Sequence, residues 1–86
     1  MKHRATPAFW RCHHELSEDV QRLADKCFGL LKDDPNHPSL DFKKVGKLWS
    51  ARVGLHYRAF AVAEKQEMIW FWIGTHDEYD KLIYNQ

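Results

Sequence analysis

The sequence is poor in three features that mark specialised classes of protein. It has only two cysteines among 86 residues, Cys12 and Cys27, which is too few to suggest a disulfide framework. It has no long apolar run, and the residues after Met1 are charged, which argues against a membrane span or a signal peptide. Its formal net charge is only +1, which alone predicts no polyanionic partner. We expect one small domain, residues 1–86, in the cytoplasm and with no role at a membrane.

Acidic residues are missing from the middle of the chain. Between Phe42 and Ala63 there are five bases and no acid, whereas the first 41 residues carry six bases and seven acids and the segment from Glu64 onward carries two bases and five acids. A basic centre between acidic ends could hold RNA locally while repelling it elsewhere. The alternative is that these side chains protect the edges of a sheet against aggregation. The five bases are Lys43, Lys44, Lys47, Arg52 and Arg58.

Two helices are predicted in the first half of the chain. Pro7 suits the first turn of a helix that we expect to run to Leu16, because a missing N–H costs nothing there. Ser17 is the predicted N-cap of a second helix, since Glu18 and Asp19 follow it in the first turn. Apolar residues then recur at three- and four-residue steps and predict one stripe buried against a sheet. That stripe consists of Val20, Leu23, Ala24, Cys27, Leu30 and Leu31.

The remaining sequence predicts a sheet and a short final helix. The apolar run 68–73 is typical of a central strand, in which Trp70 and Trp72 would share one face and belong to the core. Thr75 and Glu78 fit a capping box at the start of the last helix. A strand, a helical hairpin, an antiparallel meander and a C-terminal helix together predict an α+β sandwich. The predicted strands are residues 2–6, the segment around 40–42, and residues 48–53, 57–62 and 68–73.

Three motifs in the second half of the chain resemble one protein family. They are Trp49-Ser50-Ala51-Arg52-Val53, Tyr57-Arg58-Ala59-Phe60 and Ile73-Gly74-Thr75-His76. Their order and spacing resemble the RelE/ParE superfamily of toxins from bacterial type II toxin–antitoxin systems. Within that superfamily they are most similar to the YoeB/YafQ-like mRNA interferases, which place a histidine shortly after the last strand. The resemblance covers nearly the whole chain and implies a RelE-like fold.

The resemblance also implies an activity and its partners. It implies cleavage of mRNA, often at the ribosome, through attack of the 2′-hydroxyl, with no metal or other cofactor and with neutralisation by a cognate antitoxin protein. We expect the antitoxin to cover the basic sheet face around Arg52 and Arg58, or to displace the helix of His76. The YoeB branch has a glutamate where this chain offers only Asp41, so the identity of the general base is open. The implied catalytic residues are His76, Arg58 and Arg52, and the implied RNA- or phosphate-binding residues are Lys43, Lys44, Lys47 and Tyr79.

Physical chemistry supports these roles and also leaves alternatives. A guanidinium can meet two phosphate oxygens at once, but Arg58 could instead form a surface ion pair with an acid such as Glu64, Glu67 or Asp41. Arg52 and Arg58 share a sheet face only if the loop between their strands has three residues. At a helix N-terminus, His76 could act as a neutral base or contact a phosphate. Alternatively, it could be an exposed residue that takes no part in the reaction. Tyr79 could stack on a base or only pack against the sheet.

Other site and function classes are weighed against the nuclease. Cys12, His13 and His14 cannot converge on one ion, because three adjacent helical residues point in different directions, so we predict no metal site. Of Lys43 and Lys44 only one can face the arginines, since neighbours on a strand point to opposite faces, and the resemblance favours Lys43. The competing functions are a non-catalytic, ParE-like inhibitor of DNA gyrase and an inactive homologue that only binds its antitoxin.

Overall fold

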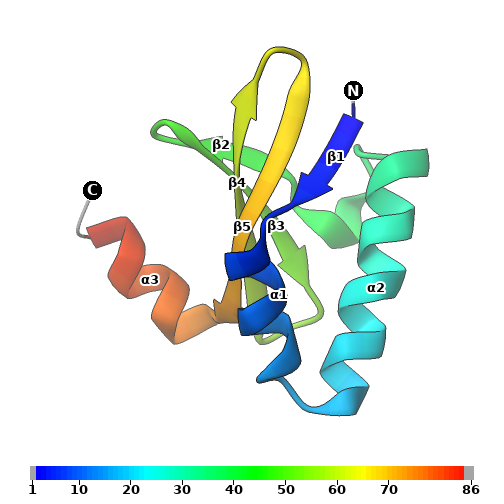
Figure 1. The fold of residues 1–86 in the computed structure, drawn as a ribbon, viewed down its shortest axis with the longest axis vertical. Coiled ribbons are helices and arrows are strands. Elements are labelled where there is room, and N and C mark those ends of the chain that lie inside the picture. The colour runs from blue at the N-terminus through cyan, green and yellow to red at the C-terminus, as the bar shows by residue number, and fades with distance from the viewer. Residues whose placement is uncertain (1, 85–86) are drawn as a thin grey trace.

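The computed structural model describes residues 2–84 and shows a five-stranded sheet with helices on both faces (Figure 1). The predicted α+β architecture is therefore confirmed. In chain order the elements are β1 (Lys2–Ala5), α1 (Pro7–His14), α2 (Glu18–Asp33), the 3₁₀ helix η1 (Pro38–Leu40), β2 (Lys43–Val45), β3 (Leu48–Val53), β4 (Tyr57–Glu64), β5 (Glu67–Thr75) and α3 (His76–Tyr84).

The sheet has the strand order β1-β5-β4-β3-β2, with β5 and β4 in its centre. Strands β2 to β5 form the predicted antiparallel meander. The first strand β1 pairs with β5 in parallel, with Lys2 opposite Glu67 and Ala5 opposite Trp70. The apolar sequence of β5 is explained by this position, because a strand with neighbours on both sides and covered faces exposes little of its surface.

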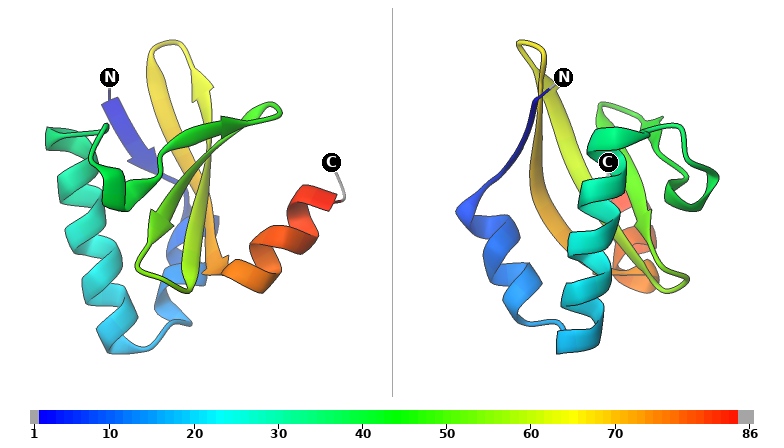
Figure 2. Two further views of the ribbon diagram at one scale, coloured as in Figure 1. Left: turned by 180° about the vertical axis from the view of Figure 1, so that it is seen from behind. Right: turned by 90° about the vertical axis from the view of Figure 1, so that its right-hand side faces the viewer.

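Helices α1 and α2 form the predicted hairpin, and α2 and α3 lie on opposite sides of the sheet (Figure 2). The Thr6 hydroxyl accepts a hydrogen bond from the Phe9 N–H at 3.2 Å, and Ser17 caps α2 through the Val20 N–H at 3.4 Å. The first helix ends at His14, two residues before the predicted end. The buried ring of His13 contacts Asp25 at 3.0 Å and ties the two helices together.

The predicted buried stripe of α2 is wrong at one position. Leu23 is 36% exposed, whereas Ala24 and Leu31 are buried and Cys27 and Phe28 are half-buried. The helix is thus rotated so that Ala24 rather than Leu23 meets the sheet. Leu23 instead lies against Gly54, where a Cβ would come within 2.5 Å of its Cδ2. A small residue in the centre of the stripe lets the helix approach the sheet closely.

The prediction that Trp70 and Trp72 share a face is also wrong. Phe60 pairs with Trp72 and Ala61 with Trp70, so Phe71 is an extra residue in β5 that has no partner of its own in β4. Such a bulge breaks the alternation of faces. Trp70 therefore lies in the core beneath α2, whereas Trp72 lies on the face that carries α3, beside Phe60 at a ring distance of 5.6 Å.

The segment before β2 forms a turn of 3₁₀ helix and not the strand expected around residues 40–42. Pro38 fits the first position of η1, and the ring of His37 accepts a hydrogen bond from the Ser39 N–H at 3.2 Å. Leu40 is fully buried and anchors this turn to the core. Asp41 follows with a φ of 42°, a left-handed conformation that aspartate tolerates better than most residues. The strand then begins at Lys43.

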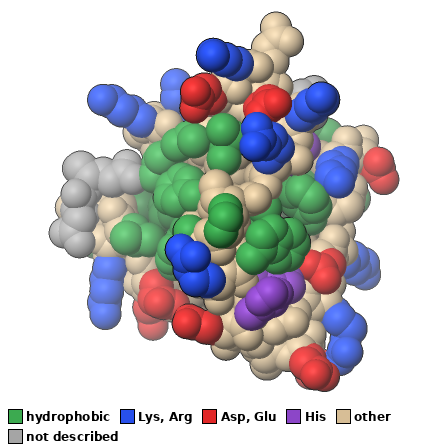
Figure 3. All heavy atoms as spheres, viewed as in Figure 1, with side chains coloured by type: hydrophobic (Ala, Val, Ile, Leu, Met, Phe, Trp, Pro, Cys, Tyr) green, Lys and Arg blue, Asp and Glu red, His purple; other side chains and the backbone are tan. Residues whose placement is uncertain are grey.

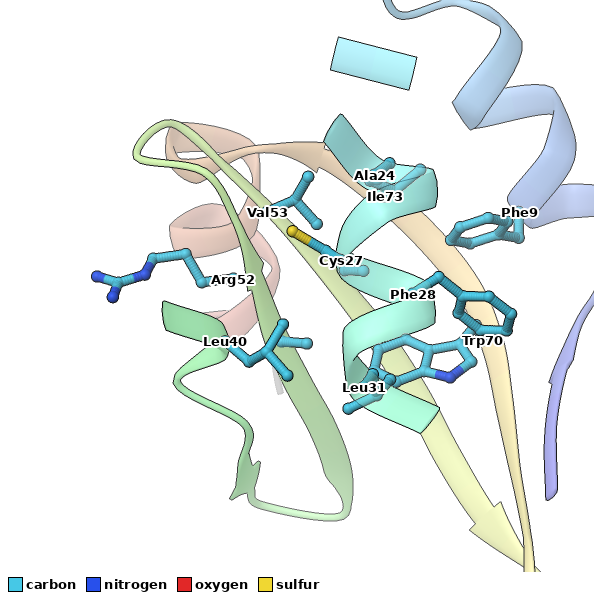
Figure 4. Close-up of a pocket in the computed structure, with 12 residues that line it drawn as sticks. Phe9, Ala24, Cys27, Phe28, Leu31, Leu40, Arg52, Val53, Trp70 and Ile73 are labelled. Atoms are coloured by element: carbon cyan, nitrogen blue, oxygen red, sulfur yellow. The ribbon is translucent and has the colours of Figure 1, made fainter. Parts of the chain in front are cut away.

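The core between α2 and the sheet leaves a small cavity of about 30 Å³ (Figure 4). Apolar side chains such as Leu31, Leu40 and Trp70 line it, so it is a packing gap and has no polar groups suited to a ligand. In the same figure Arg52 points away from the cavity. Among residues 2–84, no helix has the length and apolar character needed to span a membrane.

Candidate functional site

The loop between β3 and β4 places two arginines opposite each other. Val53 pairs with Tyr57 and Arg52 with Arg58, so the loop consists of the three residues 54–56. This is the loop length that the shared-face prediction required, because directly opposite residues of antiparallel strands point to the same side of the sheet. Ser50 lies two residues before Arg52 and therefore also belongs to this face. It is the face opposite α2.

Arg58 is buried, although the expectation of a basic sheet face around Arg52 and Arg58 implies an exposed side chain. The residue is 5% exposed. Its Nη1 donates to the hydroxyl of Ser50 at 2.9 Å, and its Nη2 donates to the carboxylate of Asp41. The guanidinium also lies 5.0 Å from the centre of the Tyr79 ring. The ion-pair alternative for Arg58 is thus realised with Asp41, and three contacts from β3, α3 and the segment after η1 fix the orientation of the guanidinium.

Asp41 is shared between two cations. In addition to Arg58, its carboxylate contacts the Nζ of Lys43 at 3.3 Å. The hydrogen bond from Arg58 holds the pKa of the Asp41 carboxyl below its usual value, and Lys43 acts in the same direction, because both contacts favour the charged form. The Asp41 side chain is 40% exposed, whereas that of Arg58 is almost completely covered. The carboxylate is therefore the exposed partner of a buried guanidinium.

Arg52 is separated from Arg58 although the two residues are direct neighbours across the strands. Its Nε donates to the backbone carbonyl of Ser39 at 3.2 Å, which draws the side chain towards η1 and the outer edge of the sheet (Figure 4). Two like charges directly opposite each other would be unfavourable. The pairing of Arg58 with Asp41 and the diversion of Arg52 both reduce this repulsion.

His76 begins α3 at the end of the central strand, as the capping-box motif predicts. The Thr75 hydroxyl accepts from the Glu78 N–H at 3.2 Å, and the Glu78 carboxylate accepts from the Thr75 N–H at 3.0 Å. The hydrogen bond from the Thr75 N–H, together with one from the Thr75 hydroxyl at 3.0 Å, lowers the pKa of the Glu78 carboxyl. The His76 N–H donates to the His56 carbonyl at 2.8 Å, so the start of α3 is anchored to the loop of the arginine hairpin. The His76 ring is half exposed and lies 3.5 Å from Asp80.

Tyr79 lies between the histidine and the buried arginine. Its ring is 5.7 Å from that of His76 and 4.9 Å from that of Phe60, against which it stacks. The residue is buried, which favours the packing role that we weighed for it over an open platform for a base. It covers one side of the Arg58 guanidinium and joins α3 to the site.

The three lysines that the resemblance implies do not all lie beside Arg58 and Asp41. Lys43, the lysine that the resemblance favours, contacts the Asp41 carboxylate. Lys44 is exposed and pairs with Trp49, so it lies on the other face of the sheet. Lys47 is exposed in the turn between β2 and β3. Sequence reasoning did not single out Ser50, although its position two residues before Arg52 was a usable signal.

The surface in Figure 3 carries basic and acidic side chains next to each other around its rim, with hydrophobic side chains gathered in the middle. This face offers no continuous basic patch, in agreement with a net charge of +1. Figure 3 shows one side of the molecule, and β2 lies in front only in the view from behind (Figure 2). Because the net charge of the whole molecule is only +1, attraction for a polyanion has to come from local groups such as Lys43.

No protein-family model and no curated protein matches this sequence, whereas solved structures match it over most of its length. YafQ from E. coli is similar with a TM-score of 0.72 and 9% identity, over 91% of this chain and 96% of that one. The RelB-RelE antitoxin–toxin complex from Methanococcus jannaschii gives a TM-score of 0.71 at 12% identity, over 92% and 96%. A YoeB/ParE toxin from Agrobacterium tumefaciens gives 0.65 at 14%, over 88% and 99%.

These similarities show the fold. The chain has the RelE-like fold, so the resemblance seen in the motifs is confirmed at the level of three-dimensional structure. At identities of 9–14% the side chains of the site have to be judged by their own geometry.

Proposed function

We propose that this chain is the toxin component of a type II toxin–antitoxin system and a metal-independent endoribonuclease that cleaves mRNA at the ribosome. Two structural neighbours with this fold are complexes of a toxin with its antitoxin, from Methanococcus jannaschii and Mycobacterium tuberculosis. They support a cognate antitoxin as the partner of this chain. Synthesis and action in the cytoplasm are part of the same proposal.

The observation that carries the nuclease proposal is the placement of Arg58 and Lys43 around one anionic group, with His76 beyond the Tyr79 ring. In the reaction, the 2′-oxygen forms a bond to phosphorus and the bond from phosphorus to the 5′-oxygen breaks. The 2′-hydroxyl proton passes to a base, and the 5′-oxygen receives a proton from an acid. The products are a 2′,3′-cyclic phosphate and a 5′-hydroxyl.

The residues of the site suit distinct parts of this reaction. Arg58 and Lys43 stabilise the charge on the nonbridging oxygens of the phosphorane, for which a fixed guanidinium is well suited. His76, with its half-exposed ring, transfers a proton as acid or base. Asp41 and His76 are the candidates for the base, and Arg52 at the sheet edge contacts a flanking phosphate. Lys47, exposed in the turn between β2 and β3, contributes an RNA contact outside the scissile group, whereas Lys44 lies on the other face and Tyr79 holds the Arg58 guanidinium in place.

The antitoxin can contact fewer of the basic side chains directly than the sequence indicates. Arg52 is half-buried and within reach of a partner, whereas Arg58 is covered and already neutralised by Asp41. An acidic antitoxin segment would therefore neutralise Arg52 and Lys43 directly, and would reach Arg58 only by replacing Asp41 or moving α3.

The runner-up is a ParE-like inhibitor of DNA gyrase, with an inactive antitoxin-binding homologue as a further alternative. The internal neutralisation of Arg58 favours these functions, because an arginine committed to a structural ion pair is not free for catalysis. The near-neutral charge acts in the same direction.

The two functions are separated by expression of variants together with mapping of mRNA ends by primer extension and a supercoiling assay on gyrase. We expect His76→Ala and Arg58→Ala to relieve growth arrest, with a loss of about 10²–10⁴ in cleavage rate for the histidine. Arg58→Lys should restore little, because an ammonium lacks the planar fork. Cleavage should survive EDTA. His14→Ala, which removes an exposed histidine on α1, is the matched control and should stay toxic.

Full toxicity of His76→Ala, with intact mRNA and inhibited gyrase, would refute the nuclease and support the inhibitor. Circular dichroism of each variant separates loss of function from loss of fold. Absence of toxicity from the wild-type chain, together with tight binding of its antitoxin, would support the inactive homologue.

A further inference from the structure

One carboxylate in this protein occupies the position between two cations that a phosphate group would take. The Asp41 carboxylate accepts from the Arg58 guanidinium and contacts Lys43 Nζ at 3.3 Å. The Arg58 guanidinium also donates a hydrogen bond to the Ser50 hydroxyl at 2.9 Å, and the Tyr79 ring covers one of its sides. Ser50 is fully buried, so this support belongs to the folded core. An anion site is therefore built, and the chain fills it with its own side chain.

Burial decides how a ligand can reach Arg58. The arginine side chain is 6% exposed, whereas the side chains of Asp41 and Lys43 are 40% and 50% exposed. Because Ser50 and Tyr79 cover other parts of the guanidinium, the way in from solvent passes through the position of Asp41. Asp41 lies outside the strands, after η1, and its φ of 42° belongs to a region that most residues avoid. Its side chain can leave without breaking the sheet.

We propose that Asp41 is a displaceable occupant of the phosphate subsite, and that a phosphodiester oxygen replaces its carboxylate between Arg58 and Lys43. The inference rests on the proposed function, since it assigns the site of the scissile phosphate. The exchange keeps the buried guanidinium paired with an anion at every stage, which matters because an unpaired buried charge is strongly unfavourable. In the absence of RNA the subsite binds free anions only weakly, because the Asp41 carboxylate competes with them for the two cations.

A purely structural ion pair predicts different behaviour. If Asp41 only stabilises the fold, its removal leaves Arg58 without a partner but creates no site for phosphate. If Asp41 competes with phosphate, its removal opens the site and increases the affinity. The substitution Asp41→Asn distinguishes the two, because it removes the charge and keeps the size of the side chain.

The test measures binding of inorganic phosphate by NMR titration and by the rise in Tm with phosphate concentration. We expect Asp41→Asn to bind phosphate at least about tenfold more tightly than the wild type, because a hydrogen bond to a charged group contributes that much or more. Glu67→Gln is the matched control, since it removes the same charge from an ion pair with Arg4 that is 3.1 Å long and largely exposed. It should bind phosphate like the wild type.

A second pair of variants keeps the test decisive if Asp41→Asn does not fold without phosphate. In the otherwise native chain, Lys43→Ala should weaken phosphate binding several-fold, whereas Lys44→Ala, on the opposite face, should leave it unchanged. Equal affinities for wild type and Asp41→Asn, or equal effects of the two lysine variants, would overturn the proposal. These measurements involve no cleavage. Tighter binding by Asp41→Asn, together with a wild-type chain that leaves mRNA intact, would refute the nuclease and keep the anion subsite.

Discussion

Two leucines of α2 offer a direct test of how the helix packs on the sheet. Leu31 is 3% exposed and Leu23 is 36% exposed, although both belong to the apolar stripe of the sequence. Leu31→Ala removes buried methyl groups beside a cavity of about 30 Å³ that the surrounding side chains have not closed. We expect it to cost about 3–4 kcal/mol, within the range of about 2–5 found for buried leucines.

Leu23→Ala should cost much less. The Leu23 side chain is open to solvent on one side, so its truncation leaves no enclosed cavity. The variant loses about two-thirds of the transfer free energy of a fully buried leucine, which is about 1.5–3 kcal/mol. The expected cost is about 1–2 kcal/mol. For a domain of this size each kcal/mol lowers the Tm by about 4–8 °C, so the two variants should melt at least about 4 °C apart.

Urea unfolding followed by tryptophan fluorescence, with thermal melts by circular dichroism, measures both costs. The slope of the free energy with urea should be equal in wild type and variants, which shows that the substitutions change stability and not the unfolded state. Equal costs for the two leucines, or a larger cost at Leu23, would refute the observed orientation of α2.

Three further predictions concern pH and backbone. Burial, the N-terminal charge and Lys32 lower the pKa of His3 from 6.5, and its Nδ1 accepts a hydrogen bond from the Trp70 indole at 3.2 Å. Because the unfolded chain then binds more protons than the folded one, stability should fall as pH drops below about 6.5. Urea midpoints across this range should show that His3→Gln reduces the slope. Thr75→Ala, which removes the N-cap of α3, should cost about 1 kcal/mol in the same assay. Gly54→Ala should lower the Tm, because φ is +66° and the new Cβ would come within 2.5 Å of Leu23; an unchanged Tm would contradict this.

Local sequence signals predicted the helices and their starts. Ser17 and Thr75 act as N-caps through hydrogen bonds to residues three positions on, as their side chains and the following acids indicate. Such caps depend on a few adjacent residues, so a single sequence is enough to find them. The motif around Arg58 and the terminal His76 likewise pointed to the RelE-like fold.

The predictions that were wrong concern features that depend on residues distant from one another in the sequence. The bulge at Phe71 depends on how β5 pairs with β4, and one extra residue moved Trp72 to the other face. The rotation of α2 depends on which side chain fits against Gly54. The burial of Arg58 depends on Asp41, 17 positions earlier in the chain, which meets the guanidinium only after η1 has turned. None of these relations has a local signature.

The parallel pairing of β1 with β5 has a consequence for the making of the protein. Lys2 to Ala5 pair with residues 67–70, so β1 cannot join the sheet until β5 has been synthesised. Such a pairing closes a loop of almost the whole chain and is slow to form. His76 follows directly after β5, and Tyr79, which covers Arg58, lies in the final helix. A nascent chain therefore cannot assemble this site until β5 and α3 have been synthesised, so any activity has to follow the folding of the complete sheet and its last helix.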